Sequence, residues 1–97
     1  MNASLFRYSM YKRMVLYMVI GEAVKYRILE LCNQQNISIN KLCIMSGVTQ
    51  STVNNIISGR NNSATISTIK KLCDGLGISI VDFFSSNCFN DLEQEIQ

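Results

Sequence analysis

Two short helical segments joined by a very tight turn constrain the fold of this chain more than any other feature. Residues 38–46 have helical periodicity, and Ser38 stands where a helix N-cap is expected. The apolar residues expected to face inward here are Ile39, Leu42 and Cys43. Gly47 then follows closely before Thr49, the expected cap of the next helix. Helices joined so closely must cross steeply, and glycine supplies the positive φ that such a turn needs.

The same signals predict an all-α bundle of five helices. The expected helices cover residues 21–35, 38–46, 49–58, 65–76 and a short segment that begins at Ser79. Asn36 and Gly77 stand where left-handed residues close a helix, and Thr65 and Ser79 are expected N-caps. The other side chains expected in the core are Val24, Ile28, Leu31, Cys32, Val53, Ile56, Ile57, Ile66, Ile69, Cys73, Leu76, Phe83 and Phe84.

The chain divides into one domain with an extension at each end. Residues 21–86 are expected to form the helical domain, residues 1–20 an N-terminal arm, and residues 87–97 a loosely held acidic tail. The arm contains an apolar run, residues 14–20, that is too short to span a membrane and that only weakly resembles a signal peptide. The aromatic and β-branched residues of the arm suit a strand, whereas its length suits a helix. Both conformations therefore remain possible for the arm. We expect a cytoplasmic protein.

The cysteines and the absence of histidine disfavour a metal site and an enzyme. The chain has four cysteines, none in a C-x-x-C pair, and no histidine. We expect the thiols to be small apolar side chains in a reducing compartment. Histidine is the commonest general base, and the sequence shows no Gly-rich phosphate loop. The sequence therefore predicts no catalysis, no cofactor and no small-molecule substrate.

Charge is distributed unevenly along the chain. All nine Lys and Arg residues lie within residues 1–73, and no Asp or Glu lies between Glu30 and Asp74. A surface that approaches phosphate excludes acidic groups, because each would repel the polyanion. Lys70 and Lys71 are expected to be solvated. For Arg27 two interpretations remain, a solvated side chain and a DNA contact.

The segment 49–58 has an exposed face of unusual chemistry. At 100° per residue, one arc of about 140° holds only amide and hydroxyl side chains: Gln50, Ser51, Asn54, Asn55 and Ser58. A merely solvated helix usually carries Lys and Glu, which are better helix formers than Asn or Ser. A carboxamide offers a donor and an acceptor together, which match N6 and N7 of adenine in the major groove.

Residues 38–60, S-I-N-K-L-C-I-M-S-G-V-T-Q-S-T-V-N-N-I-I-S-G-R, resemble the helix-turn-helix of the Cro and phage-repressor (XRE) family. The resemblance extends from about Tyr26 through I-S-I-V-D-F-F. It implies a five-helix, lambda-repressor-like bundle. In that fold the second helix of the helix-turn-helix enters the major groove.

The resemblance also implies roles for particular residues. Those at positions that contact base edges, or beside them, are Gln50, Ser51, Asn54 and Asn55; those near phosphates are Ser38, Thr49, Arg60 and Asn61. The chain departs from the family at Ile39, where many relatives have a Gln that touches phosphate. Cys32 and Ile57 replace an ion pair that some relatives bury.

Two functions are consistent with the sequence. The first is a transcriptional regulator, a repressor, that binds double-stranded DNA sequence-specifically as a homodimer. The second is an antitoxin-like or other protein-interaction module that uses the apolar arm. Neither requires a membrane.

Overall fold

The computed structural model describes residues 19–58, 64–92 and 94 of the 97-residue chain. The elements of this part are all helical, which confirms the all-α class. They are α2 (Ile20–Gln35), α3 (Ile39–Ser46), α4 (Gln50–Ser58), α5 (Ile66–Leu76), α6 (Ile80–Phe84) and a 3-10 helix, η1 (Asn87–Phe89).

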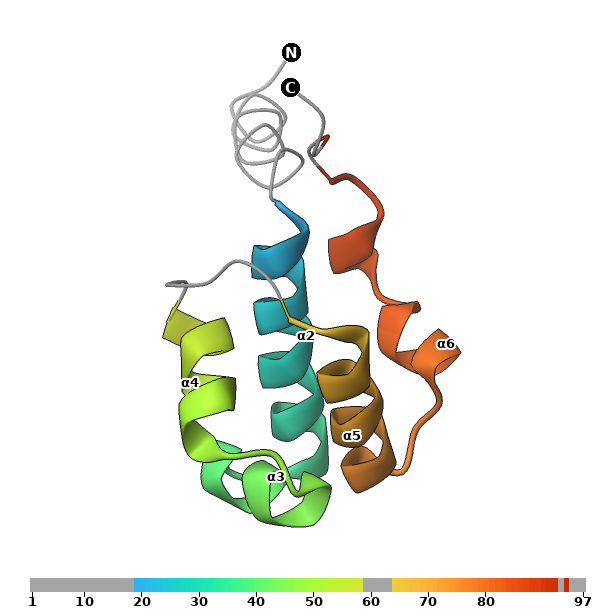
Figure 1. Cartoon of the computed structure of the whole chain (residues 1–97). Coiled ribbons are helices and arrows are strands. Elements are labelled where there is room, and N and C mark those ends of the chain that lie inside the picture. The colour runs from blue at the N-terminus through green and yellow to red at the C-terminus, as the bar shows by residue number, and fades with distance from the viewer. Residues whose placement is uncertain (1–18, 59–63, 93, 95–97) are drawn as a thin grey trace, which may run out of the picture.

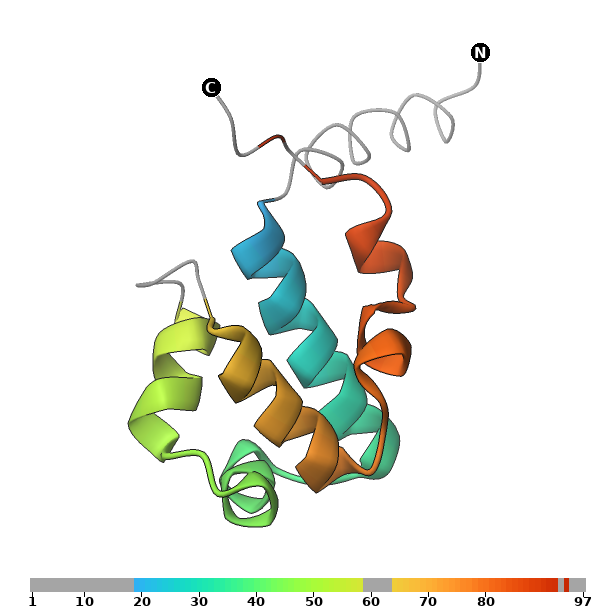
Figure 2. The same ribbon diagram turned by 45° about the vertical axis from the view of Figure 1, so that its right-hand side comes forward.

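The helices pack around α2 with different partners on its two flanks. Figures 1 and 2 show α4 on one flank of α2 and α6 with η1 on the opposite flank. Helix α3 crosses one end of the bundle and packs mainly against α5, while α5 also contacts α6. The C-terminal elements therefore leave the outer side of α4 uncovered.

A single apolar core joins all five α-helices. Each helix contributes at least one side chain that is fully enclosed, and the largest of these are Phe83, Ile28, Leu42, Leu72, Val53 and Cys73. Phe83 also packs edge-to-face against Phe84, with ring centroids 5.0 Å apart, and Phe84 lies 4.8 Å from Phe89. This aromatic cluster attaches α6 and η1 to the bundle.

The helix ends follow the expected capping residues. The hydroxyl oxygens of Ser38, Thr65 and Ser79 each accept a hydrogen bond from an amide in the first turn that follows. Asn36 and Gly77 close α2 and α5 with φ values of 56° and 73°. These caps satisfy amides and carbonyls that a helix end leaves without partners.

Two features of the core differ from the expectations. Ile66 was expected to face inward, but it is 71% exposed. Helical side chains lean toward the N-terminus, so this first residue of α5 points away from the core that later turns cover. Leu72, which was not among the expected core residues, is fully buried. The buried side of α5 therefore begins at Ile69.

Helical structure extends past both ends of the range expected for the domain, residues 21–86. Helix α2 begins at Ile20, inside the expected arm, whose residues 1–18 lie outside the described part of the chain. At the other end η1 lies within the expected tail, and half-buried Phe89 packs against the core. None of the helices in the described residues is long and apolar enough to cross a membrane.

A glycine inside α5 permits close contact between two helix backbones. A Cβ atom placed on Gly75 would lie 2.8 Å from Cα and Cβ of Ser46 and 2.9 Å from its amide nitrogen. Real Cβ atoms do not approach backbone atoms this closely, so α3 would have to move away from α5. Gly75 is therefore required by the approach of α3, although glycine is a poor helix former.

We expect the substitution Gly75→Ala to destabilise the protein by about 1–3 kcal/mol, the usual range for overpacking a core. In an exposed helix the same change would stabilise by roughly 0.5–1 kcal/mol. Urea unfolding followed by circular dichroism measures the difference, with Ser67→Ala on the exposed face of α5 as the control. A Gly75→Ala variant as stable as the original chain would contradict the close contact.

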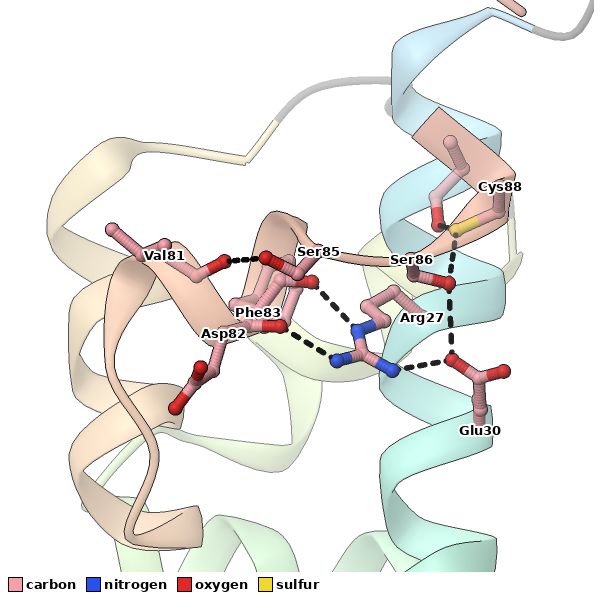
Figure 3. Close-up of polar contacts among 9 residues, drawn as sticks. Arg27, Glu30, Val81, Asp82, Phe83, Ser85, Ser86 and Cys88 are labelled. Atoms are coloured by element: carbon pink, nitrogen blue, oxygen red, sulfur yellow. Dashed lines mark hydrogen bonds and ion pairs between the residues drawn. The ribbon is translucent and has the colours of Figure 1, made fainter. Parts of the chain in front are cut away.

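Arg27 is a buried cation that attaches α6 to α2 (Figure 3). Its Nε donates to the carbonyl oxygen of Phe83 at 2.6 Å, and its Nη2 donates to that of Asp82 at 2.7 Å. Its Nη1 forms an ion pair with Glu30, which also accepts a hydrogen bond from Ser86. The guanidinium thus bonds to two carbonyls near the end of α6, of which that of Asp82 also accepts from the amide of Ser85 at 3.2 Å.

This geometry answers the question that the sequence left open. Arg27 is 8% exposed and bonds to α6, so it is neither a solvated side chain nor a candidate DNA contact. A planar guanidinium with several donors suits this place better than an ammonium group, because it serves three acceptors at once.

We expect Arg27→Ala to lower the free energy of unfolding by about 1–3 kcal/mol, since the buried carbonyl of Phe83 is left without a donor. The control is Lys25→Ala, whose ammonium lies 5.3 Å from the ring centroid of exposed Tyr26. That contact is worth only about 0.5–1 kcal/mol. Equal losses for the two variants in thermal unfolding would contradict the role assigned to Arg27.

Candidate nucleic-acid interface

The turn between α3 and α4 is held by backbone conformation and by one buried side chain. Gly47 has a φ of 70°, and its amide donates to the carbonyl of Cys43, which ends α3. Val48 follows and is only 8% exposed, so it anchors the turn to the core. Ser46 donates its hydroxyl hydrogen to the carbonyl of Leu42 at 2.7 Å. These contacts fix the direction in which α4 leaves the turn.

Thr49 closes the first turn of α4, as expected of a cap. Its hydroxyl oxygen accepts from the amide of Thr52 at 3.3 Å. The same oxygen lies 2.9 Å from the hydroxyl of Thr52 and 3.4 Å from that of Ser51. The hydroxyls of Thr49, Ser51 and Thr52 therefore lie together at the N-terminus of α4.

Helix α4 has one buried and one exposed side. Val53 is fully enclosed and Ile56 is 5% exposed, so both hold the helix against the core. Ile57, expected beside them, is only half-buried at the margin of this side. The exposed side carries Gln50, Ser51, Asn54, Asn55 and Ser58, all without charge. The expected division of the helix into apolar and amide-rich faces is confirmed.

The three carboxamides of this face differ in their surroundings. Gln50 donates through Nε2 to Oδ1 of Asn40, which lies on α3. Within the part of the chain that the structure describes, the side chains of Asn54 and Asn55 have no hydrogen-bond partner. The exposed face therefore presents one carboxamide that is held by a neighbour and two that are available to a ligand.

Asn40 was not singled out from the sequence. It is the second residue of α3 and is exposed. The tight turn brings it beside the first residue of α4 although ten positions separate it from Gln50. Periodicity within one helix does not reveal such a pair, because the contact depends on how two helices cross. The neighbouring Ile39, by contrast, packs against the core and is not available for a phosphate contact.

Two of the expected phosphate-contacting residues lie at helix N-termini. Ser38 accepts from the amide of Lys41 at 3.0 Å, and Thr49 caps α4 as described above. A hydroxyl whose oxygen accepts at a cap can still donate its own hydrogen to an anion. Arg60 and Asn61, the other two, lie outside the described residues.

Charge near this surface is sparse. Lys41 on α3 is exposed beside Asn40, and neither α3 nor α4 contains an acidic residue. On α5, Lys70 is paired with Asp74 at 2.5 Å, and this hydrogen bond raises the pKa of the lysine. Lys70 therefore stays protonated, and its side chain is 57% exposed, as expected of a solvated lysine.

Three of the four thiols lie in the interior, and that of Cys88 is half-buried. Cys32, Cys43 and Cys73 are buried, and burial raises the pKa of each thiol. A raised pKa disfavours the thiolate, which is the form that binds metals and attacks electrophiles. No cluster of three potential metal-ligating His, Cys, Asp or Glu residues occurs in the described ranges.

Comparison with known proteins identifies the domain. Residues 27–88 match the family model of the Cro/C1-type HTH DNA-binding domain, which covers more than half of the chain. The fold is similar to that in the crystal structure of the prophage Lp1 protein 11, with a TM-score of 0.68 and 44% sequence identity. That alignment covers 75% of this chain and 96% of the other. No curated protein matched the chain. The crossed pair α3–α4, the capped amide-rich helix and the family match agree, and the chain belongs to the Cro/C1-type helix-turn-helix family of DNA-binding regulators.

Proposed function

We propose that this chain is a sequence-specific repressor of transcription that places α4 in the major groove of its operator. The DNA-binding domain comprises residues 21–86 extended by Ile20 and by η1, and residues 1–19 form an arm. The base-contacting residues are Gln50, Ser51, Asn54 and Asn55, and the phosphate-contacting residues are Ser38, Thr49, Arg60 and Asn61.

The observation that carries the proposal is the uncharged, exposed face of α4, whose opposite face packs in the core. Val53 and Ile56 anchor the helix in the core, so the amide side projects outward without cover from α6 or η1. Carboxamides and hydroxyls are suited to the donor and acceptor pattern of base edges. Asn residues weaken a helix, so their presence on this face is explained by recognition rather than by stability.

Replacing Gln50 or Asn55 with Ala tests this proposal. Each substitution is expected to reduce the preference for selected operator DNA over unrelated duplex by about 1–3 kcal/mol. The variants are compared by equilibrium binding to a duplex that the original chain selects from a random pool. Folding should be unaffected because both side chains are exposed.

Asn90→Ala is the matched control, since it removes an exposed carboxamide near η1 on the opposite flank. It should leave sequence preference unchanged. If Gln50→Ala and Asn55→Ala also leave the preference unchanged, α4 is not the helix that recognises the bases.

We also propose that the protein acts as a homodimer on a palindrome. One helix of this size makes few base contacts, and two half-sites about one helical turn apart increase the affinity. The aromatic cluster offers little surface for a second copy, because Phe83 is enclosed and Phe84 and Phe89 pack on each other. The apolar arm is therefore our candidate for the dimer contact.

Light scattering of the full chain and of a variant that lacks residues 1–17 measures the role of the arm. We expect a dimer for the full chain, a monomer for the variant, and weaker but still sequence-specific binding of the variant to a single half-site. A variant that remains dimeric would place the contact elsewhere. If neither form binds DNA, the arm as a protein-interaction element becomes the better explanation of the chain.

A further inference from the structure

The face of α2 that points away from the core carries two large apolar side chains, Tyr26 and Leu29, about one turn apart. Tyr26 is 48% exposed, and Leu29 is half-buried but is not among the side chains that pack against the core. Glu22 and Asn33, both exposed, continue the same face toward the two ends of the helix. We call the side chains of these four residues the outer face of α2.

The other sides of α2 are covered by parts of the same chain. On one flank Arg27 bonds to the carbonyl of Phe83, and the carbonyl of Ala23 accepts from the thiol of Cys88 at 3.5 Å. Helix α4 packs on the opposite flank (Figure 1). Ile28 lies fully enclosed on the side of the core. The described elements therefore enclose α2 on three sides and leave its outer face open.

The apolar run at the end of the arm has the composition to cover this face. Residues 14–18 are M-V-L-Y-M, and no charged side chain interrupts them. Flexible methionine side chains fit irregular apolar surfaces, and tyrosine buries a large apolar area. The charges also agree, because residues 1–13 hold three basic and no acidic side chains, while Glu22 has no ion-pair partner in the described part of the chain. The arm and the outer face are therefore complementary in both respects.

The junction between the arm and α2 indicates that the arm does not cover the outer face of its own chain. Val19 is the N-cap of α2, and its carbonyl accepts from two amides of the first turn, so the helix begins directly after it. Measured from Ile20, Tyr26 lies about 9 Å and Leu29 about 14 Å along the helix axis. To reach them the run would have to reverse direction just before the helix. Residues 10–19 contain no Gly, Pro, Asn, Asp or Ser, the residues that favour tight turns.

We propose that the outer face of α2 binds residues 14–18 of a second copy of this chain, so that two copies exchange their arms across a twofold axis. The inference rests on the proposed homodimer and assigns to it the surface on which each arm docks. Each contact then occurs twice, because the two copies are related by symmetry. The contact uses no residue of α4, so the amide face of that helix is left free for DNA.

Two full-length variants test the two halves of the contact separately. Leu29→Glu places a charge on the outer face and leaves the arm intact, whereas Leu16→Glu does the reverse. Sedimentation equilibrium measures the dimer Kd of each. We expect each substitution to raise this Kd at least about 100-fold, because it removes a buried leucine from both symmetry-related contacts. Val81→Glu changes an apolar side chain that is 74% exposed on α6, and as the control it should leave the Kd unchanged.

A mixture of the two variants distinguishes exchange between copies from a contact within one chain. In a mixed pair the intact arm of the Leu29→Glu variant meets the intact outer face of the Leu16→Glu variant, so one of the two contacts is complete. We expect the heterodimer, detected through a fluorescent label on one variant, to form at least about tenfold more tightly than either variant pairs with itself. An arm that covered its own outer face would give no such gain.

The outcomes separate this inference from the proposed function. A monomeric original chain would overturn the proposed homodimer together with the docking surface. A Leu29→Glu variant that dimerises as well as the original chain, or a mixture without heterodimer, would overturn the docking surface alone. Leu29→Glu should keep the preference for selected DNA over unrelated duplex, because α4 is unchanged. Tyr26→Glu repeats the test at the exposed neighbour if thermal unfolding shows that Leu29→Glu is not folded.

Discussion

A close approach of two backbones, between Ser46 on α3 and Gly75 on α5, is the contact on which the placement of the proposed binding surface depends. It determines how near α3 lies to the core, and α3 in turn determines where Gly47 turns the chain. Helix α4 begins directly after this turn and makes fewer core contacts of its own than α2 or α5. A displacement of α3 would therefore be transmitted to α4 through a connection too short to absorb it.

On the flank of α2 opposite α4, polar contacts add to the aromatic cluster that holds α6 and η1. Arg27 bonds to two carbonyls at the end of α6, and Glu30 extends the network to Ser86. Cys88 adds a weak contact from its thiol to the carbonyl of Ala23 at 3.5 Å. These interactions keep the C-terminal elements on the side of the molecule away from α4. The fold thus separates the contacts that close the domain from the surface available to DNA.

The sequence predicted those parts of the structure that depend on neighbours in the chain. Caps such as Ser38 and left-handed residues such as Asn36 act within one turn, so residue type and position were sufficient. The two faces of α4 followed from helical periodicity for the same reason. The exposure of Ile66 did not follow, because periodicity does not indicate where along a helix the core ends.

Contacts between distant segments were not predictable in this way. Arg27 bonds to acceptors that lie 55 and 56 residues away in the chain. Both acceptors are main-chain carbonyls, which every residue type has, so the sequence does not identify them. Asn40 appeared to be an ordinary surface residue until the crossing of two helices placed it beside Gln50. Gly75 was not singled out from the sequence, and only the position of Ser46 explains why a glycine stands inside α5. In each case the missing information was the relative placement of two helices.

The uncharged face of α4 has a consequence for how binding responds to the surrounding solution. Affinity for DNA falls with salt in proportion to the number of cations that neutralise phosphates. Amides and hydroxyls displace water from base edges and release no counterions. Ionic strength should therefore change how tightly the domain holds any duplex, while the ratio between its preferred site and a competitor stays nearly constant. A regulator built in this way would discriminate equally well in dilute and in concentrated electrolyte.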